Sequence, residues 1–114
     1  MERSDRARAA LATARADTIR LVQALGGRYQ AIVEASALES NDDEHDPEGA
    51  TVAFERAQVG STLAAAQAEL AELDVAAGRI EDGTYWTCVT CGGPIDEGRL
   101  EARPVARTCI RCAR

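Results

Sequence analysis

Aromatic side chains are scarce in this chain of 114 residues. They make up 4% of the sequence, as one Phe, one Trp and two Tyr. The apolar residues are mainly Ala, Leu, Val and Ile, a composition typical of paired helices rather than of sandwiches or barrels. A chain of this size with so few large side chains usually needs a metal ion, disulfides or a partner to stabilise its fold.

Lysine is absent, and all 13 basic residues are arginine, against 19 acidic residues and a formal net charge of −6. Because the neutralisation of phosphates needs clustered cations, this acidity argues against a general DNA- or RNA-binding protein. An acidic body is better suited to docking on a basic protein surface. We therefore expect a protein partner and no direct, sequence-specific contact with nucleic acid.

Long apolar runs are absent as well. The N-terminal stretch MERSDRARAALATARAD is charged and Ala-rich, and it lacks the apolar core of a signal peptide. No run approaches about 18 apolar residues, the length of a membrane-spanning helix. We expect a cytoplasmic protein that does not associate with membranes. The thiols of a protein in the cytoplasm stay reduced.

Two long stretches carry apolar residues at helical spacing. The stripe in residues 4–40, which contain no proline, comprises Leu11, Thr18, Leu21, Val22, Leu25, Tyr29, Ile32 and Val33. The stripe from Pro47 to about Ile80 comprises Val52, Val59, Leu63, Ala66, Leu70, Leu73, Ala77 and Ile80. Facing heptad stripes joined by a short turn predict a mainly α fold, with a long antiparallel coiled-coil hairpin over residues 1–82.

Gly26 and Gly27 interrupt the first stripe, at a cost of about 2 kcal/mol relative to two alanines. This pair is consistent with a bend in the helix, with a close contact between helices, or with a local loss of helix stability that the fold tolerates.

The segment SNDDEHDPEG, residues 40–49, is polar and strongly acidic and cannot extend the stripe. Asp46 and Pro47 are typical of a helix start, with Asp as the N-cap and Pro at the first helical position. We expect an acidic tip of the hairpin at about residues 41–50. His45, the only histidine, is interpreted as an exposed turn residue and not as a catalytic or metal-binding one. The acidic run lacks the spacing of a calcium-binding loop, so we expect no dedicated metal site there.

All four cysteines lie near the C-terminus, in two C-x2-C pairs. Cys88 and Cys91 form the first pair, Cys109 and Cys112 form the second, and 17 residues separate them. This spacing is the expected layout of a structural Zn²⁺ site. Four sulfur ligands close the tetrahedron and leave no position for a catalytic water. A rubredoxin-like iron site has the same four-sulfur layout, and the spacing alone does not exclude it.

Disulfides are disfavoured by the expected reducing compartment, and redox-active dithiols by the absence of a thioredoxin-like βαβ pattern. We therefore expect residues 83–114 to form a small C4 zinc-finger module that the metal holds together. The side chains expected between this module and the base of the helices are Tyr85, Trp86, Ile95 and Leu100. The sequence contains no Ser/His/Asp or Cys/His constellation and no phosphate-binding glycine loop, so we do not expect an enzyme.

The stretch GTYWTCVTCGGPIDEGRLEARPVARTCIRC, which follows an acidic-tipped pair of helices, resembles the DksA/TraR family of C4-type zinc-finger proteins. The segment RLEARP, Arg99–Pro104, is especially characteristic, and the resemblance covers about Asp42–Cys112. It implies a bacterial transcription regulator that binds RNA polymerase directly. In the family the coiled coil enters the secondary channel of the polymerase and its tip approaches the catalytic centre.

The resemblance also implies which residues face the polymerase active site. The family tip carries an Asp-Pro, a second acid, and an Ala two residues later, and this chain has DPEGA. Asp46, Glu48 and Ala50 are therefore the expected tip residues, in a tip one residue shorter and with Glu in place of Asp.

A second group of family residues contacts the alarmone ppGpp in responsive members. Of the three basic positions involved, only Arg103 is basic in this chain, and the others are Glu72 and Ala113. The resemblance thus implies structural zinc as the cofactor and a weak or absent response to ppGpp.

The alternative function belongs to another class of protein. A structural or adaptor zinc protein would use its coiled coil to pair with itself or another protein, without entering RNA polymerase. Because the two stripes favour an intramolecular pair, we expect a monomer.

Overall fold

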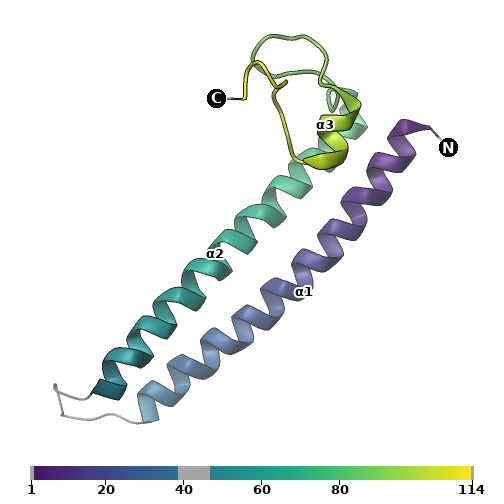
Figure 1. The fold of residues 1–114 in the computed structure, drawn as a ribbon. Helices are drawn as coiled ribbons and strands as arrows, with labels where there is room; N and C mark the ends of the chain where they lie inside the picture. The colour runs from purple at the N-terminus through teal and green to yellow at the C-terminus, as the bar shows by residue number, and fades with distance from the viewer. Residues whose placement is uncertain (1, 39–46, 114) are drawn as a thin grey trace. The chain divides into compact units, whose positions relative to one another are not determined.

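A computed structural model describes residues 2–38 and 47–113, with the backbone alone at residues 47 and 48. Within these ranges the chain forms three helices (Figure 1), which are α1, Arg3–Leu38, α2, Pro47–Asp82, and α3, Glu97–Ala102. The same ranges contain no β-strand, only one antiparallel bridge between Thr87 and Pro94. The predicted mainly α fold class, with two long helices and a C-terminal cysteine module, is confirmed.

The described chain divides into two compact units. The first unit contains Met1–Asp17 together with Glu69–Arg114, and the second contains Thr18–Ala68. The predicted domain boundary between residues 82 and 83 stays a prediction. No helix in the described ranges is both long and apolar enough to cross a membrane.

The second unit pairs α1 and α2 in antiparallel directions. Arg28 of α1 donates a 3.0 Å hydrogen bond to Glu55 of α2, although the two residues are 27 positions apart in the sequence. Val59 and Ala66 of the predicted stripe are 6% exposed. The prediction that Leu21 widens the stripe is wrong, because this side chain is 48% exposed.

The helices of the first unit are antiparallel as well. Arg8 and Glu81 are 2.8 Å apart, and Arg15 and Asp74 are 2.7 Å apart. These four side chains are spaced by seven along their helices, so the ion pairs repeat along one edge of the helix pair. Exposed pairs of this kind contribute little stability.

The core of the first unit joins the helices to the cysteine module. Its helical part comprises Leu11, Leu73, Ala76 and Ile80, and its C-terminal part comprises Tyr85, Cys88, Ile95, Leu100, Ala106 and Cys109. Trp86 is partly buried against this cluster. The predicted packing of Tyr85, Trp86, Ile95 and Leu100 against the helices is therefore confirmed.

One position of the second stripe differs from the prediction. Ala77 is exposed, and its neighbour Ala76 is 4% exposed. Ala76 lies three residues after Leu73 and four before Ile80, so all three share one side of an α-helix. The buried side of α2 is thus set by the cysteine module that packs on it, and a strict seven-residue repeat does not capture this.

The glycine pair in α1 does not mark a close helix contact. A Cβ atom built at Gly26 or Gly27 would have no neighbouring heavy atom within 4 Å. Helix α1 continues through both residues. By contrast, a Cβ at Gly60 of α2 would lie 3.1 Å from Cε2 of Tyr29, so this glycine allows the tyrosine ring to approach the helix.

Candidate metal centre

The first cysteine pair lies in a tight turn that follows α2. The N–H of Cys88 donates a 2.8 Å hydrogen bond to the carbonyl of Gly93, and the N–H of Ile95 donates to Trp86 at 2.7 Å. Gly92 completes the turn with a φ of +73°, a conformation that residues with a Cβ rarely adopt. Gly92 thus lets the chain fold back tightly after Cys91.

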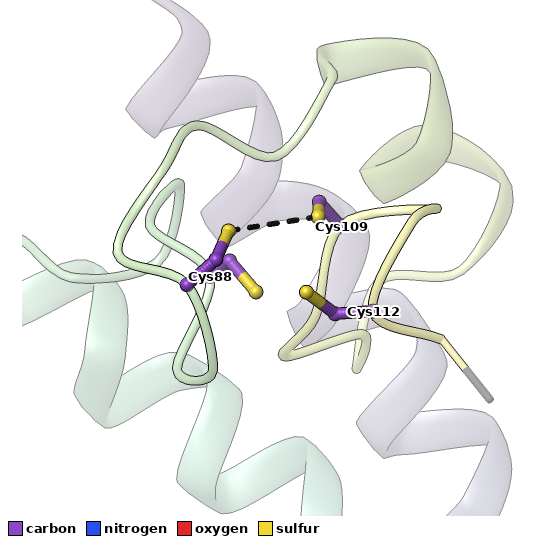
Figure 2. A group of neighbouring side chains, drawn as sticks. Cys88, Cys109 and Cys112 are labelled. Carbon is purple, nitrogen blue, oxygen red and sulfur yellow. Dashed lines mark hydrogen bonds between the residues drawn. The ribbon is translucent and has the colours of Figure 1, made fainter.

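The second cysteine pair lies in a turn near the C-terminus. The N–H of Cys112 donates a 3.0 Å hydrogen bond to the carbonyl of Cys109. The two turns are joined through their backbones, because the N–H of Val89 donates to the carbonyl of Arg107 at 2.9 Å. Figure 2 shows the side chains of Cys88, Cys109 and Cys112 around one small space.

The distances between the sulfur atoms fit a tetrahedral zinc ion. All four Sγ atoms lie within 4.8 Å of one another. The Sγ atoms of Cys91 and Cys109 are 3.8 Å apart. A Zn–S bond of about 2.3 Å in a tetrahedron also places two sulfurs about 3.8 Å apart. The four cysteines are therefore arranged as in a structural zinc site.

Backbone N–H groups point at the sulfur atoms. The N–H of Thr90 lies 3.4 Å from Sγ of Cys88, and the N–H of Gly93 lies 3.4 Å from Sγ of Cys91. Such donors stabilise thiolates, which are the form of cysteine that binds metal. Cys88 and Cys109 are 1% and 7% exposed, whereas Cys91 is exposed. The site is thus buried on one side and open to solvent on the other.

Hydrogen bonds and burial move the pKa values of three of the four thiols in different directions. The backbone N–H of Cys91, followed by that of Cys109, lowers the pKa of Cys88 to about 6. The side chain of Cys109 is the main cause that raises the pKa of Cys112 to about 12. Burial raises the pKa of Cys109, but hydrogen bonds from Cys112 and Arg111 outweigh it and the net shift is downward. A bound divalent cation favours the thiolate form of each sulfur that coordinates it.

The turn that leads from α2 into the first cysteine pair is fixed by Arg79. This arginine is 8% exposed, and its guanidinium donates hydrogen bonds of 2.6 Å to the carbonyls of Thr84 and Thr87. The sequence analysis did not identify this residue. A basic residue in the last turn of a helix is common on the surface, so the only available signal was its position close to the cysteines.

Two further hydrogen bonds hold the segment between the cysteine pairs. The hydroxyl of Tyr85 donates to the carbonyl of Pro104 at 2.7 Å, and burial raises the pKa of this tyrosine. Nε of Arg99 donates to the carbonyl of Thr108 at 2.8 Å. Arg99 and Pro104 both belong to the segment RLEARP, so part of this segment positions the second cysteine turn.

The three positions compared with alarmone contacts lie together. Glu72, Arg103 and Ala113 line one polar cavity of about 320 Å³, next to Cys112. Arg99 and Arg107 line the same cavity and were missed by sequence reasoning. The cavity therefore contains three guanidinium-bearing side chains and one carboxylate.

The predicted tip residues are described only in part. Asp46 lies outside the described residues, and so does the side chain of Glu48. Ala50 is an exposed residue near the start of α2, and Pro47 is the first residue of that helix, as predicted. The assignment of these residues to the tip stays a prediction.

A pair of long helices followed by a four-cysteine metal module defines a helical zinc-finger protein. Residues 83–114 match the family described as the prokaryotic dksA/traR C4-type zinc finger. The recognition of this family from the sequence is confirmed for these residues.

A solved structure and a sequence relative extend the comparison. The structure of transcription factor DksA2 from Pseudomonas aeruginosa superimposes with a TM-score of 0.81, over 96% of this chain and 78% of that one. At 24% sequence identity, this likeness shows a shared fold. An uncharacterized protein of Aquifex aeolicus (strain VF5) is 50% identical over 46 residues, which are 40% of this chain and 32% of that protein. The match thus spans about a third of the length of this relative.

Proposed function

We propose that the protein is a cytoplasmic, bacterial transcription regulator that binds RNA polymerase directly through the secondary channel. The observation that carries the proposal is a DksA fold, with a TM-score of 0.81, combined with a zinc finger of the DksA/TraR type. The solved protein of this fold is described as a transcription factor. The protein acts by occupying the channel and carries out no reaction of its own.

Each part of the chain has a separate role in this proposal. The tip residues Asp46, Glu48 and Ala50 approach the catalytic centre, where a carboxylate can act near the polymerase Mg²⁺ or its moving elements. The zinc module keeps the base of the helices folded. The net charge of −6 supports a partner with basic channel walls over nucleic acid.

The response to ppGpp is weak or absent in this proposal. Arg99, Arg103 and Arg107 would attract a polyphosphate, but Glu72 lines the same cavity. A carboxylate at a phosphate site repels the negatively charged ligand.

Binding to core RNA polymerase from the same organism tests the proposal. The zinc-loaded protein is titrated against the polymerase, with a Gre-type channel factor as competitor, beside a triple variant of Asp46, Glu48 and Ala50. We expect competition by the channel factor. We also expect the triple variant to bind and to lose its effect on transcription.

Absence of binding at micromolar concentration, with zinc content intact, would contradict the proposal and favour an adaptor function. Mass measurement in solution separates these functions further. A monomer agrees with the proposal, and a stable dimer in which the tip is protected would contradict it.

A further inference from the structure

A second cavity lies in the first unit, between the first turns of α1 and the zinc module. Its volume is about 270 Å³, and its walls include Arg3, Tyr85, Trp86, Glu97, Leu100 and Glu101. None of these residues was assigned to the tip, to the metal or to the alarmone position. The cavity combines two aromatic and several aliphatic side chains with two carboxylates and with the guanidinium groups of Arg3 and Arg6.

The indole ring of Trp86 is the apolar wall of this cavity. Tyr85 packs against the ring edge-on, with the centroids 5.0 Å apart and the planes at 90°. Tyr85 is itself 2% exposed and hydrogen-bonded to Pro104, so the orientation of Trp86 is fixed from the core side. The indole ring is therefore held in one orientation as a wall of the cavity.

A cation already occupies one face of the indole. Cζ of Arg3 lies 4.3 Å from the ring centroid, which is cation–π geometry. Among residues 2–38 and 47–113, the Arg3 side chain makes no ion pair or hydrogen bond besides this contact. Arg3 is also the first residue of α1, where the helix dipole disfavours a positive charge. The arginine is thus held by the ring alone.

The carboxylates of the cavity differ in their pairing. Glu97 is paired with Arg6 at 3.1 Å. Glu101 makes no ion pair or side-chain hydrogen bond among residues 2–38 and 47–113, although it lines the same cavity as Arg3. The cavity thus presents to a guanidinium both the ring of Trp86 and the carboxylate of Glu101. Arg3 interacts only with the first of these.

We propose that this cavity binds an arginine side chain of a partner protein, and that Arg3 occupies the site in its absence. The planar guanidinium stacks on aromatic faces and pairs with carboxylates in a way that a lysine ammonium does not. The partner arginine gains the Glu101 contact, and the displaced Arg3 loses only an interaction at an unfavourable helix end. This inference goes beyond the polymerase proposal, and its test needs no polymerase.

Trp86 is the only tryptophan in the chain, so with the fold and the zinc content unchanged its fluorescence reports on this cavity. The zinc-loaded full chain is titrated with the blocked tripeptide acetyl-Gly-Arg-Gly-amide. The matched probes replace arginine with citrulline, which keeps the shape and removes the charge, or with lysine. Arg3→Ala, Glu101→Gln and, as a control outside the cavity, Arg107→Ala are measured beside the natural chain.

We expect saturable changes in emission with the arginine peptide and none with the citrulline peptide. Removal of the internal competitor by Arg3→Ala should tighten binding at least about threefold, since a larger fraction of the protein is competent to bind. Glu101→Gln should weaken it by about threefold to tenfold because the charge-assisted contact is lost. Arg107→Ala should leave the affinity unchanged.

Two results would overturn the proposal. The first is a change in Trp86 emission that rises linearly with the concentration of the arginine peptide and does not saturate, in both the natural chain and Arg3→Ala. The second is equal affinity for the arginine and lysine peptides, because a site specific for guanidinium distinguishes them. Circular dichroism and zinc content identify any variant that fails to fold, and Glu101→Asp then replaces Glu101→Gln with an expected partial loss.

Discussion

The guanidinium of Arg79 donates a 2.6 Å hydrogen bond to the carbonyl oxygen of Thr84, across the point where α2 ends. The backbone carbonyl of Arg79 in turn accepts hydrogen bonds from the N–H groups of Thr84 and Tyr85, at 2.9 and 3.1 Å. Gly83, with a φ of +83°, makes the reversal possible. One residue thus sets the direction in which the chain leaves the helix and enters the first cysteine turn.

Replacement of Arg79 by Gln should destabilise the protein by about 2–4 kcal/mol, because the carbonyls of Thr84 and Thr87 lose a charged hydrogen-bond donor. Urea unfolding followed by Trp86 fluorescence measures the change in the free energy of unfolding. Arg56→Gln, at an exposed position of the same helix, is the control and should have almost no effect. Equal stability of the two variants would contradict the role given to Arg79.

Removal of zinc by a strong chelator should unfold residues 83–114, because the core there depends on the two cysteine turns. We expect one zinc ion per chain, a red shift of Trp86 emission on chelation, and recovery when zinc is added back. Elemental analysis and fluorescence of the same samples measure these quantities. Iron in the purified protein, or unchanged Trp86 emission after complete metal removal, would contradict a structural zinc site.

Gly26→Ala and Gly27→Ala should each stabilise the protein by about 0.5–1 kcal/mol, since alanine favours the helix and its methyl group meets no neighbour. Gly60→Ala is the matched variant in the other helix. Its methyl group would lie 3.1 Å from the ring of Tyr29, so we expect little gain or a loss. Thermal unfolding measures the stability of the three variants. An equal increase in stability at all three positions would show that the contact with Tyr29 is unimportant.

Tyr85→Phe should cost about 1 kcal/mol near neutral pH, because the carbonyl of Pro104 loses its hydrogen-bond donor. Burial raises the pKa of Tyr85, so the folded state favours the neutral phenol. The natural chain is therefore more stable than Tyr85→Phe by the full amount below about pH 10, the pKa of tyrosine in the unfolded chain. This difference in the free energy of unfolding is lost as the pH rises through the pKa of Tyr85 in the folded protein. Unfolding curves at pH 8 to 11 compare the two proteins. A difference in stability that stays constant across this range would contradict a buried, neutral Tyr85.

The features predicted from sequence are those with a local signature. The heptad stripes predicted two long helices, Pro47 marked the start of α2, and the C-x2-C spacing predicted the cysteine cluster. Each signal depends on residues close together in the chain, or on the strict geometry of metal ligands.

The features that sequence reasoning missed depend on contacts between distant segments. Helix α3 is six residues long and has no stripe of its own, so its pattern carries too few positions to predict a helix. The burial of Ala76, and the cation–π contact of Arg3 with Trp86, follow from how the cysteine module packs on the helices. No spacing rule in a single sequence encodes such a contact.

The most direct test of the polymerase proposal is a cross-link from the predicted tip. A photoreactive amino acid is introduced at Ala50, which is exposed, and the zinc-loaded protein is illuminated with core RNA polymerase. The control is the same replacement at exposed Gln67, about 25 Å further along α2 at 1.5 Å per residue. We predict that position 50 cross-links to polymerase elements beside the catalytic Mg²⁺, that position 67 does not, and that a Gre-type factor abolishes the product. Two results would contradict the proposal. Position 50 could cross-link only to the outer surface of the polymerase, or the channel factor could fail to reduce the cross-links from position 50.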